Sequence, residues 1–371
     1  MGFYVSCKLD IMNYFIPFIS FFVSALGAAV SMPWLLRFCK KRGLYDMPNE
    51  RKVHHTKIPR LGGVLFMPCA LIGVAVAMVC MIFLHLELPK FTISSFLILT
   101  GVFLIYLIGL LDDVLGLSAR VKFVIQFVAS LFLPLCNLYF NNLYGFLGIY
   151  EIPMWIGYPL TIFVCLLIVN SINLIDGIDG LASGLSLIAL TAFTVFFYQL
   201  NAMNYAMFSL GLIGAVLVFF YYNMFGKVEN TTKTFMGDTG SLILGYGLSY
   251  LAIKLAMDND AVLPYRPGAL LMSFSLLLVP TFDLIRVALF RLKKGVSIFH
   301  ADKTHIHHKF LAAGFSMHQA LVAILALQLG FCLLNGILYC NGVKDSIIVL
   351  LDVLVFTLVQ IGLTRMKKVE E

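Results

Sequence analysis

The sequence predicts an all-α, polytopic integral membrane protein. Apolar residues make up 61% of its 371 residues and charged residues only 12%, and the mean hydropathy is +0.95. That charged share is about half the value typical of a soluble domain. The apolar residues also form one long run after another, each close to the roughly 20 residues that an α-helix needs to cross a bilayer. We therefore expect a single membrane domain over residues 1–371 and no separate soluble domain.

Eleven apolar runs are long enough to be transmembrane helices. In chain order they lie at about 14–38, 62–86, 92–111, 121–140, 155–174, 181–200, 205–225, 240–257, 268–290, 320–340 and 345–364. The eight cysteines are scattered through these runs without a C-x-x-C pair. We expect them to be small packing residues rather than disulfides or a zinc site.

The basic residues favour one orientation in the membrane. If the N-terminus lies outside, all but five of the 26 Lys and Arg residues fall in inside loops and helix ends; the exceptions are Lys8, Lys90, Lys254, Arg266 and Lys344. The positive-inside rule then predicts a periplasmic N-terminus and a cytosolic C-terminus. Every unusual polar cluster falls on that inside face, so we expect the chemistry at the cytosolic surface.

The stretch from Asn170 to Ala182 places polar residues and glycines between two apolar runs. Its polar members recur every three residues: Asn170, Asn173, Asp176 and Asp179. On a helix they would form one slanted stripe, while Gly177 and Gly180 loosen the backbone near the carboxylates. One carboxylate at the bilayer centre costs about 2.5–3.5 kcal/mol. Two so close must face water, a metal or a cationic substrate group; the alternative is a polar hinge between two helices.

Two adjacent carboxylates, Asp112 and Asp113, end the third apolar run. Adjacent carboxylates raise each other's pKa unless a cation is near, and Arg120 and Lys122 follow within ten residues. The pair is either a site group or a solvated helix end. Lys122 opens the next run, where it could extend along the helix to the surface or hold an anionic headgroup.

The segment from Phe235 to Ser241 opens the eighth apolar run. Gly237 and Gly240 flank Asp238 and allow close approach of the backbone. A new helix begins here, and helix N-termini attract anions. Because Mg²⁺ commonly takes one or two carboxylates plus substrate phosphates, we expect Asp238 to hold a cation that bridges to phosphate. The alternative is that Asp238 is the N-cap of the helix.

The segment from His300 to His308 is the densest polar run in the chain. The spacing of its histidines does not fit a zinc site, and the segment contains no cysteine that could act as a further ligand. We expect a donor-rich loop for a nucleotide diphosphate, with Lys303 and Lys309 adding charge; the alternative is a basic loop on anionic lipid. Asp283 and Arg286 are three residues apart, which favours a structural ion pair within one helix.

Four motifs carry a resemblance: in chain order, the Asp112–Asp113 pair with Lys122, the Asn170–Gly180 stretch, the Met236–Ser241 segment and the His305–His308 segment. Together they resemble the polyprenyl-phosphate N-acetylhexosamine-1-phosphate transferase family. The family includes the bacterial phospho-N-acetylmuramoyl-pentapeptide transferase, the undecaprenyl-phosphate N-acetylglucosamine-1-phosphate transferase and the eukaryotic dolichyl-phosphate enzyme. The match runs from about Leu44 to His308. Ile306 interrupts the three consecutive histidines typical of the muramoyl-pentapeptide branch. The histidine motif, like the eleven spans with a cytosolic C-terminus, therefore resembles the N-acetylglucosamine branch.

The resemblance implies Mg²⁺ as the cofactor, with Asn173 and Asp238 as its ligands. It implies that Lys122 and Asp112 lie near the lipid phosphate. The other implied site residues are the acids Asp113, Asp176 and Asp179, the histidines His305, His307 and His308, the first-loop residues Asp46 and Arg60 that meet the nucleotide sugar, and Asn170 as a further substrate-binding residue.

The implied reaction transfers N-acetylglucosamine 1-phosphate from UDP-N-acetylglucosamine to undecaprenyl phosphate and releases UMP. Direct attack by the lipid phosphate and a covalent phospho-aspartate both stay open. The expected setting is the bacterial inner membrane, with the bilayer and both substrates as partners, no nucleic acid, and a homodimer left open. The alternatives are the muramoyl-pentapeptide reaction, another UDP-N-acetylhexosamine, a phosphatidyltransferase and, from another class, a secondary transporter.

Overall fold

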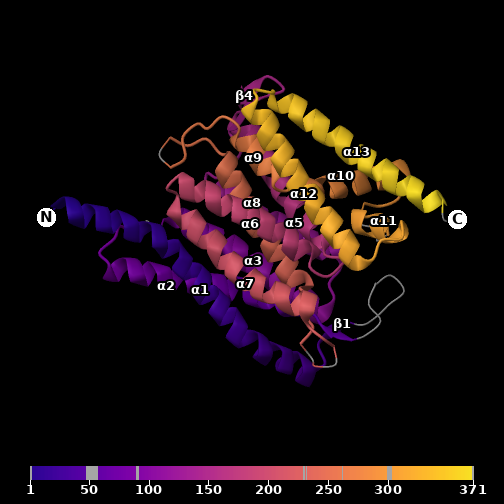
Figure 1. Ribbon diagram of the computed structural model, residues 1–371, viewed down its shortest axis with the longest axis horizontal. Helices are drawn as coiled ribbons and strands as arrows, with labels where there is room; N and C mark the ends of the chain where they lie inside the picture. Colours follow the sequence, from indigo (N-terminus) through magenta and orange to yellow (C-terminus); the bar gives the residue numbers. More distant parts are fainter. Residues whose placement is uncertain are drawn as a thin grey trace.

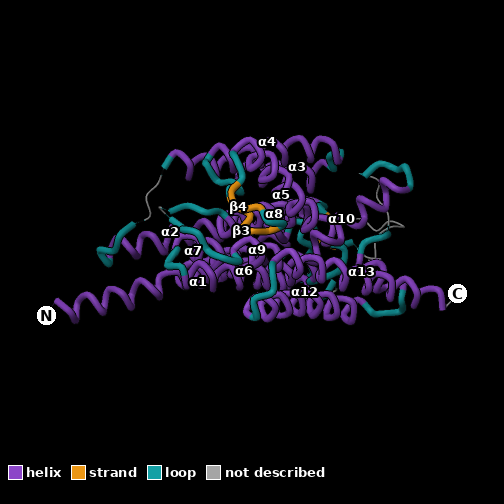
Figure 2. Tube along the Cα trace, turned by 90° about the horizontal axis from the view of Figure 1, so that it is seen from above, coloured by secondary structure: helices purple, strands orange, loops and turns teal. Residues whose placement is uncertain are grey.

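The protein is an elongated bundle of helices in a computed structural model that describes residues 2–46, 57–88, 92–228, 230, 232–260, 262–298 and 303–369, with side chains from residue 15 to residue 366 within those ranges. The two ends of the chain lie at opposite ends of the molecule (Figures 1 and 2). α1 packs against α2 and α7, whereas α12 and α13 cover the other side of the bundle.

The elements follow one another in an almost entirely helical order. The helices are α1 (Gly2–Arg42), α2 (Phe66–Phe83), α3 (Ile93–Leu115), α4 (Ala119–Leu135), α5 (Met154–Ile175), α6 (Leu181–Gln199), α7 (Met203–Phe225), α8 (Gly237–Ala256), α9 (Ala269–Ser275), α10 (Leu278–Lys293), α11 (Ile306–Ala312), α12 (Met317–Cys340) and α13 (Asp345–Val369), with a 3₁₀ turn η1 at Gly62–Leu65. Two antiparallel hairpins interrupt the loops: β1 (Tyr45–Asp46) with β2 (Ile58–Pro59), and β3 (Asn142–Phe146) with β4 (Ile149–Glu151).

All eleven expected apolar runs fall on helices. Nine helices in the described part of the chain are long and apolar enough to cross a membrane, and ten if the bent pair α9–α10 counts as one span. α4 has 17 residues, slightly fewer than the roughly 20 that span the hydrocarbon core. The polytopic membrane class therefore holds, while the number of crossings and the direction of the chain stay predictions.

The run expected at about 268–290 is not one continuous helix, because the chain bends by 73° between α9 and α10. Gln328 of α12 pairs with the backbone groups that the break frees. Its Oε1 accepts from the Val279 N–H at 3.0 Å, and its Nε2 donates to the Ser275 carbonyl at 2.7 Å. A broken helix persists at membrane depth only when such groups are paired, so this one side chain makes the bend tolerable.

α8 is the central helix of the bundle. It packs against α3, α5, α6 and α9, lies in the middle of both views (Figures 1 and 2), and almost every one of its residues is buried. Small residues allow the close approach: a Cβ atom on Gly240 would lie 2.7 Å from the Cα atom of Gly63 in η1. This packing fixes the first turn of α8 beside the end of α5 and the β1–β2 hairpin.

Candidate active site

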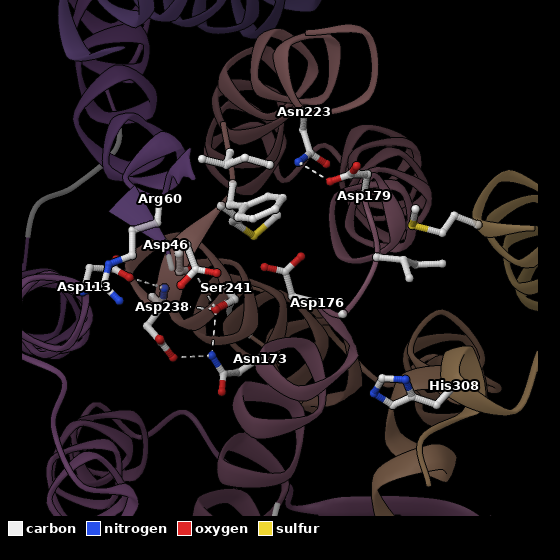
Figure 3. Close-up of a pocket in the computed structure, with 17 residues that line it drawn as sticks. Asp46, Arg60, Asp113, Asn173, Asp176, Asp179, Asn223, Asp238, Ser241 and His308 are labelled. Carbon is white, nitrogen blue, oxygen red and sulfur yellow. Dashed lines mark hydrogen bonds between the residues drawn. The ribbon is translucent and has the colours of Figure 1, made fainter. Parts of the chain in front are cut away.

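The polar motifs meet in a cavity of ≈ 390 Å³ at one end of the bundle. Its walls come from the ends of α3, α5, α7 and α8, the turn between α5 and α6, the β1–β2 hairpin and α11 (Figure 3). Eight of the expected site residues line it: Asp46, Arg60, Asp113, Asn173, Asp176, Asp179, Asp238 and His308. Segments more than 260 residues apart in the chain are thus brought together at one face.

Asp113 holds the N-terminus of α8. Its Oδ1 accepts from the Asp238 N–H at 2.8 Å, and its Oδ2 accepts from the Thr239 N–H at 2.9 Å and the Thr239 hydroxyl at 2.6 Å. The first N–H groups of a helix lack partners within it, and here a carboxylate from α3 supplies them. The N-capping alternative for Asp238 is therefore wrong, because Met236 occupies the cap position and Asp238 lies in the first turn.

Gly237 makes this close approach sterically feasible. Its φ is +74°, in the left-handed region that favours glycine. A Cβ atom there would lie 2.7 Å from both carboxylate oxygens of Asp113 and 2.2 Å from the carbonyl oxygen of Arg60. Any side chain at this position would push Asp113 away from the helix, so the glycine belongs to the site as much as the acid does.

Asp238 is the meeting point of two polar side chains from other helices. Its Oδ1 lies 3.2 Å from the Lys122 ammonium, which also pairs with Asp112 Oδ2 at 2.8 Å. Asn173 Nδ2 donates to the same Asp238 oxygen at 2.7 Å and to Ser241 Oγ at 2.9 Å. Lys122 therefore supplies the counter-charge expected for the acidic pair and does not extend away to the surface; Arg120 is exposed.

The turn between α5 and α6 carries two of the carboxylates. α5 ends at Ile175, so Asp176 and Asp179 lie outside the helix and the single polar stripe does not form. Asp179 pairs with Lys233 at 2.6 Å and accepts from Asn223 Nδ2 at 3.2 Å. The stretch therefore contains a hinge between two helices, which was the alternative to a functional site. Its two carboxylates nevertheless line the cavity.

The side chain of Asp176 points into the cavity (Figure 3). The side chain is accessible from the cavity, yet the density of protein around it strips away much of its water. This desolvation, together with the negative charges of Asp238, Asp179 and Asp113, raises the pKa of Asp176 to about 8. The neutral form of this carboxyl group is therefore favoured over a wider pH range than in an ordinary aspartate.

The raised pKa of Asp176 predicts a pH dependence of stability in the absence of divalent cations. The folded protein binds this proton more tightly than the unfolded chain, so the free energy of unfolding should fall as the pH rises from the ordinary value of 3.8 to about 8. Asp176→Asn should reduce that fall in a series of thermal unfolding curves in detergent. Glu151→Gln, on the exposed strand β4, should follow the wild type; an unchanged slope in Asp176→Asn would contradict the assignment.

The three histidines of the expected loop differ in their surroundings. His305 is buried, and its Nδ1 lies 2.8 Å from Asp283 Oδ2, while the Ile306 N–H donates to Asp283 Oδ1 at 3.0 Å. Asp283 also pairs with Arg286 at 2.7 Å, as expected. Asp283 therefore anchors the start of α11, a role that the sequence spacing alone did not reveal. Only His308 of the three lines the cavity.

His307 packs behind the cavity. Its ring is 2% exposed and lies against the turn after α5, where a Cβ atom on Gly177 would come within 2.1 Å of His307 Nε2. Burial, with the nearby His308 and His305, lowers the pKa of His307 to about 3. His307 is therefore a neutral ring at physiological pH, better suited to holding the turn than to neutralising a phosphate.

Two of the four expected substrate residues, Lys122 and Asn170, do not line the cavity, although Lys122 contacts Asp238, which does. Three unexpected residues join the hydrogen bonds of the site. Asn170 lies on α5 and donates to Gln126 Oε1 and to the Leu166 carbonyl, both at 2.8 Å. The unexpected participants are Asn223, Lys233 and Ser241. Two of them could have been noticed in the sequence, because Ser241 ends the Phe235–Ser241 segment and Asn223 interrupts an apolar run. Nothing in the sequence pattern singled out Lys233.

The oxygen-rich wall fits a hard cation such as Mg²⁺. Among the described residues no group of three His, Cys, Asp or Glu side chains is arranged to hold a metal, but Mg²⁺ often takes only one or two carboxylates and completes its shell with substrate oxygens and water. Asp238 and Asn173 are already in contact at 2.7 Å. Turning the Asn173 amide by half a turn would present its oxygen beside that of Asp238.

The chain is similar to one family model and to several named proteins. The family model described as glycosyl transferase family 4 matches residues 95–256. A Bacillus subtilis protein named as a probable undecaprenyl-phosphate N-acetylglucosaminyl 1-phosphate transferase is 31% identical over 91% of this chain and 89% of its own length. Proteins named as undecaprenyl-phosphate alpha-N-acetylglucosaminyl 1-phosphate transferases from Yersinia pestis and Escherichia coli O157:H7 are 30% and 29% identical, over 76% and 90% of this chain and 74% and 87% of theirs.

The matched region contains most of the site. Residues 95–256 include the acidic pair on α3, Lys122, the α5–α6 turn and the first turn of α8. The β1–β2 hairpin and α11 lie outside it, but the alignment with the Bacillus subtilis relative extends over 346 residues. The chain therefore belongs to glycosyl transferase family 4, in the group of polyprenyl-phosphate N-acetylhexosamine-1-phosphate transferases.

Proposed function

We propose that this protein transfers N-acetylglucosamine 1-phosphate from UDP-N-acetylglucosamine to undecaprenyl phosphate. An oxygen of the lipid phosphate forms a bond to the sugar-bearing phosphorus, the bond between the two phosphates of UDP breaks, and UMP leaves. The names of the relatives support this proposal, because they state undecaprenyl phosphate as the acceptor and N-acetylglucosaminyl 1-phosphate as the transferred group of those proteins. We further propose that this is the first membrane step of a cell-surface glycan.

The excess of carboxylates in the cavity is the observation that carries this proposal. Five acidic side chains line it, beside the basic group of Arg60 and the ring of His308. Such a wall repels a diphosphate unless a cation enters with it. Arg60 supports an anionic substrate too, because its Nε is buried without a hydrogen-bond partner in the described structure. A cavity of this kind suits a metal-bound nucleotide sugar.

Mg²⁺ is the cation we propose, held by Asp238 and Asn173. Bound there, it would neutralise charge on the donor's phosphates, which is the main requirement of phosphoryl transfer. The protein supplies the positions of its ligands: Asp113 orients the turn that carries Asp238, and Ser241 orients the Asn173 amide. Arg60 adds a positive charge to the wall of the cavity, and the ring of His308 lies at the same wall.

Lys122 is the residue we propose for the lipid phosphate. Its ammonium lies between Asp112 and Asp238, at 2.8 Å and 3.2 Å, so it borders the metal ligands. A phosphate monoester has its second pKa near 6, and the acceptor is already largely dianionic at neutral pH. It therefore needs orientation more than a base, and Asp112 is suited to hold Lys122 in place.

Direct attack is favoured over a phospho-aspartate on Asp113. A nucleophilic carboxylate needs a free oxygen aimed at the phosphorus, whereas both oxygens of Asp113 accept hydrogen bonds from α8. Inversion of configuration at the transferred phosphorus would support direct attack, and retention would support a covalent step through another carboxylate.

The proposed location is the bacterial inner membrane, with the cavity open to the cytosol. The cavity lies at the end of the bundle where α1 ends in Lys40, Lys41 and Arg42. Basic residues mark the cytosolic side of membrane proteins, and UDP-sugars are cytosolic reagents.

UMP release is the measurement that tests the reaction. The detergent-purified protein would receive undecaprenyl phosphate, Mg²⁺ and, in parallel, UDP-N-acetylglucosamine, UDP-N-acetylgalactosamine or UDP-N-acetylmuramoyl-pentapeptide. We expect release with the first donor only, dependence on the lipid acceptor, and loss of release when a chelator is added. Omitting the acceptor is the control that separates transfer from hydrolysis of the donor.

Each other outcome points to a different function. Release with the pentapeptide donor would place the protein in the peptidoglycan branch and overturn the interpretation of Ile306. Release with UDP-N-acetylgalactosamine as well would widen the range of UDP-sugars that the protein accepts. No release with any donor, from protein shown to be folded by thermal unfolding, would reject the transferase and favour a transporter.

A further inference from the structure

A second cavity of ≈ 610 Å³ lies between α10, α11 and α13, three elements that stand together near the C-terminal end in Figure 1. It shares no lining residue with the catalytic cavity. Most of its wall is apolar, with Phe282 and Leu289 from α10 facing Phe356 and Ile361 from α13. A groove of this size and composition is typical of sites that bind part of an apolar ligand.

Basic side chains gather in the same groove. Arg286, Lys309 and Arg365 line it, and no acidic residue of the described structure does so. Asp283, which does not line the groove, forms an ion pair with Arg286. The net positive charge of the groove therefore comes from Lys309 and Arg365. Lys309 donates to Thr364 Oγ1 at 3.3 Å, which joins α11 to α13 at the wall of the groove. Burial and the nearby Arg286 lower the pKa of Lys309 to about 8, against the opposing effect of the Asp283 carboxylate.

A buried amide in the groove is left without partners. Gln360 is 5% exposed, and neither its Nε2 nor its Oε1 makes a hydrogen bond in the described structure. The Nε of Arg286 is buried and unpaired too. Buried polar groups in proteins are nearly always paired. Two unpaired donors beside a cationic cluster therefore indicate that a polar, anionic group completes this site.

We propose that this groove binds an anionic phospholipid of the surrounding bilayer. The phosphate would accept from Arg286 Nε and Gln360 Nε2 and pair with Lys309 and Arg365, while an acyl chain lies between α10 and α13. The lipid acceptor fits this groove less well, because a phosphate held here would not meet Asp238 or Lys122. Anionic lipids are attracted by clusters of basic residues at the membrane surface.

Lipid-dependent thermal unfolding tests this site on the full chain in detergent. The probes are dioleoyl-phosphatidylglycerol, dioleoyl-phosphatidylcholine, undecaprenyl phosphate and inorganic phosphate, and native mass spectrometry counts the lipids that stay bound. We expect phosphatidylglycerol to raise the unfolding midpoint and to remain bound, with much weaker effects from the other three. Equal effects of the two phospholipids would overturn the requirement for negative charge.

Substitutions in the groove sharpen the test. Arg365→Gln should weaken the phosphatidylglycerol effect by about tenfold in lipid concentration, whereas Lys293→Gln, an exposed cation of α10 outside the groove, should not. Gln360→Leu should raise the midpoint in plain detergent by about 2 °C, because it removes an unpaired buried amide, and should weaken the lipid effect. Wild-type lipid binding by both groove variants would overturn the proposal, as would undecaprenyl phosphate binding that is lost in the same variants.

Discussion

Replacing Asp238 with asparagine is expected to slow UMP release by about a thousandfold, while the protein stays folded. A metal ion that neutralises developing charge contributes several kcal/mol to phosphoryl transfer, and the amide would remove the charge that holds it. The fold should be little affected, because the Asp238 side chain is 31% exposed and its pairing with Lys122 is partly solvated.

Two measurements separate this prediction from simple unfolding. The rate of UMP release would be followed over a range of Mg²⁺ concentrations, and the thermal midpoint would be recorded for the same preparation. Glu151→Gln makes the same chemical change on the exposed strand β4 and should keep the wild-type rate. A near-normal rate in Asp238→Asn at low Mg²⁺ would remove the metal assignment, since the proposed ligand would then be dispensable.

Asp113→Asn is expected to abolish activity for a different reason, namely loss of structure at the start of α8. The carboxylate accepts three hydrogen bonds at 2.6–2.9 Å, and each bond to a charged group contributes about 1.5–3 kcal/mol. An amide has only one oxygen, and its NH₂ group would face the N–H donors of α8. We expect the free energy of unfolding to fall by about 3 kcal/mol or more.

The thermal midpoint distinguishes the two variants, since only Asp113→Asn should lower it by several degrees. Thr239→Val is the matched control, because it removes one of the three donors and leaves the carboxylate and both backbone bonds. It should cost about 1 kcal/mol and keep measurable activity. A wild-type midpoint in Asp113→Asn would show that this carboxylate does not hold the helix, and would restore a direct catalytic role as the explanation of any lost activity.

The sequence by itself determined the membrane class, the helical segments and the family. Hydropathy is a local property, so eleven apolar runs could be located without knowing how they pack. The acidic motifs were also visible, because carboxylates in apolar runs are costly and their presence indicates a site. The comparisons confirmed the family that these motifs indicated. The two glycines, Gly177 and Gly180, indicated a looser backbone, but the helical stripe expected through Asp179 was wrong, because α5 ends at Ile175.

Only the tertiary structure decided what each polar residue does. Asp112 and Asp113 are neighbours in the chain, yet one pairs with Lys122 and the other holds α8. The expected histidines diverged in the same way: His308 lines the cavity, while His307 is a neutral ring packed on Gly177. These roles depend on which distant backbone atoms come within hydrogen-bond distance, and that depends on how the helices pack.

The same reason explains what the sequence did not show. The bend between α9 and α10 is stabilised by Gln328, some 50 residues further along the chain, and the basic groove needs α13 to lie beside α10 and α11. Spacing along one helix predicts contacts of residues three or four apart. Such spacing contains no information on which helices become neighbours. The packing of α13 beside α10 and α11 is what places the Gln360 amide, unpaired in the described structure, beside three basic side chains.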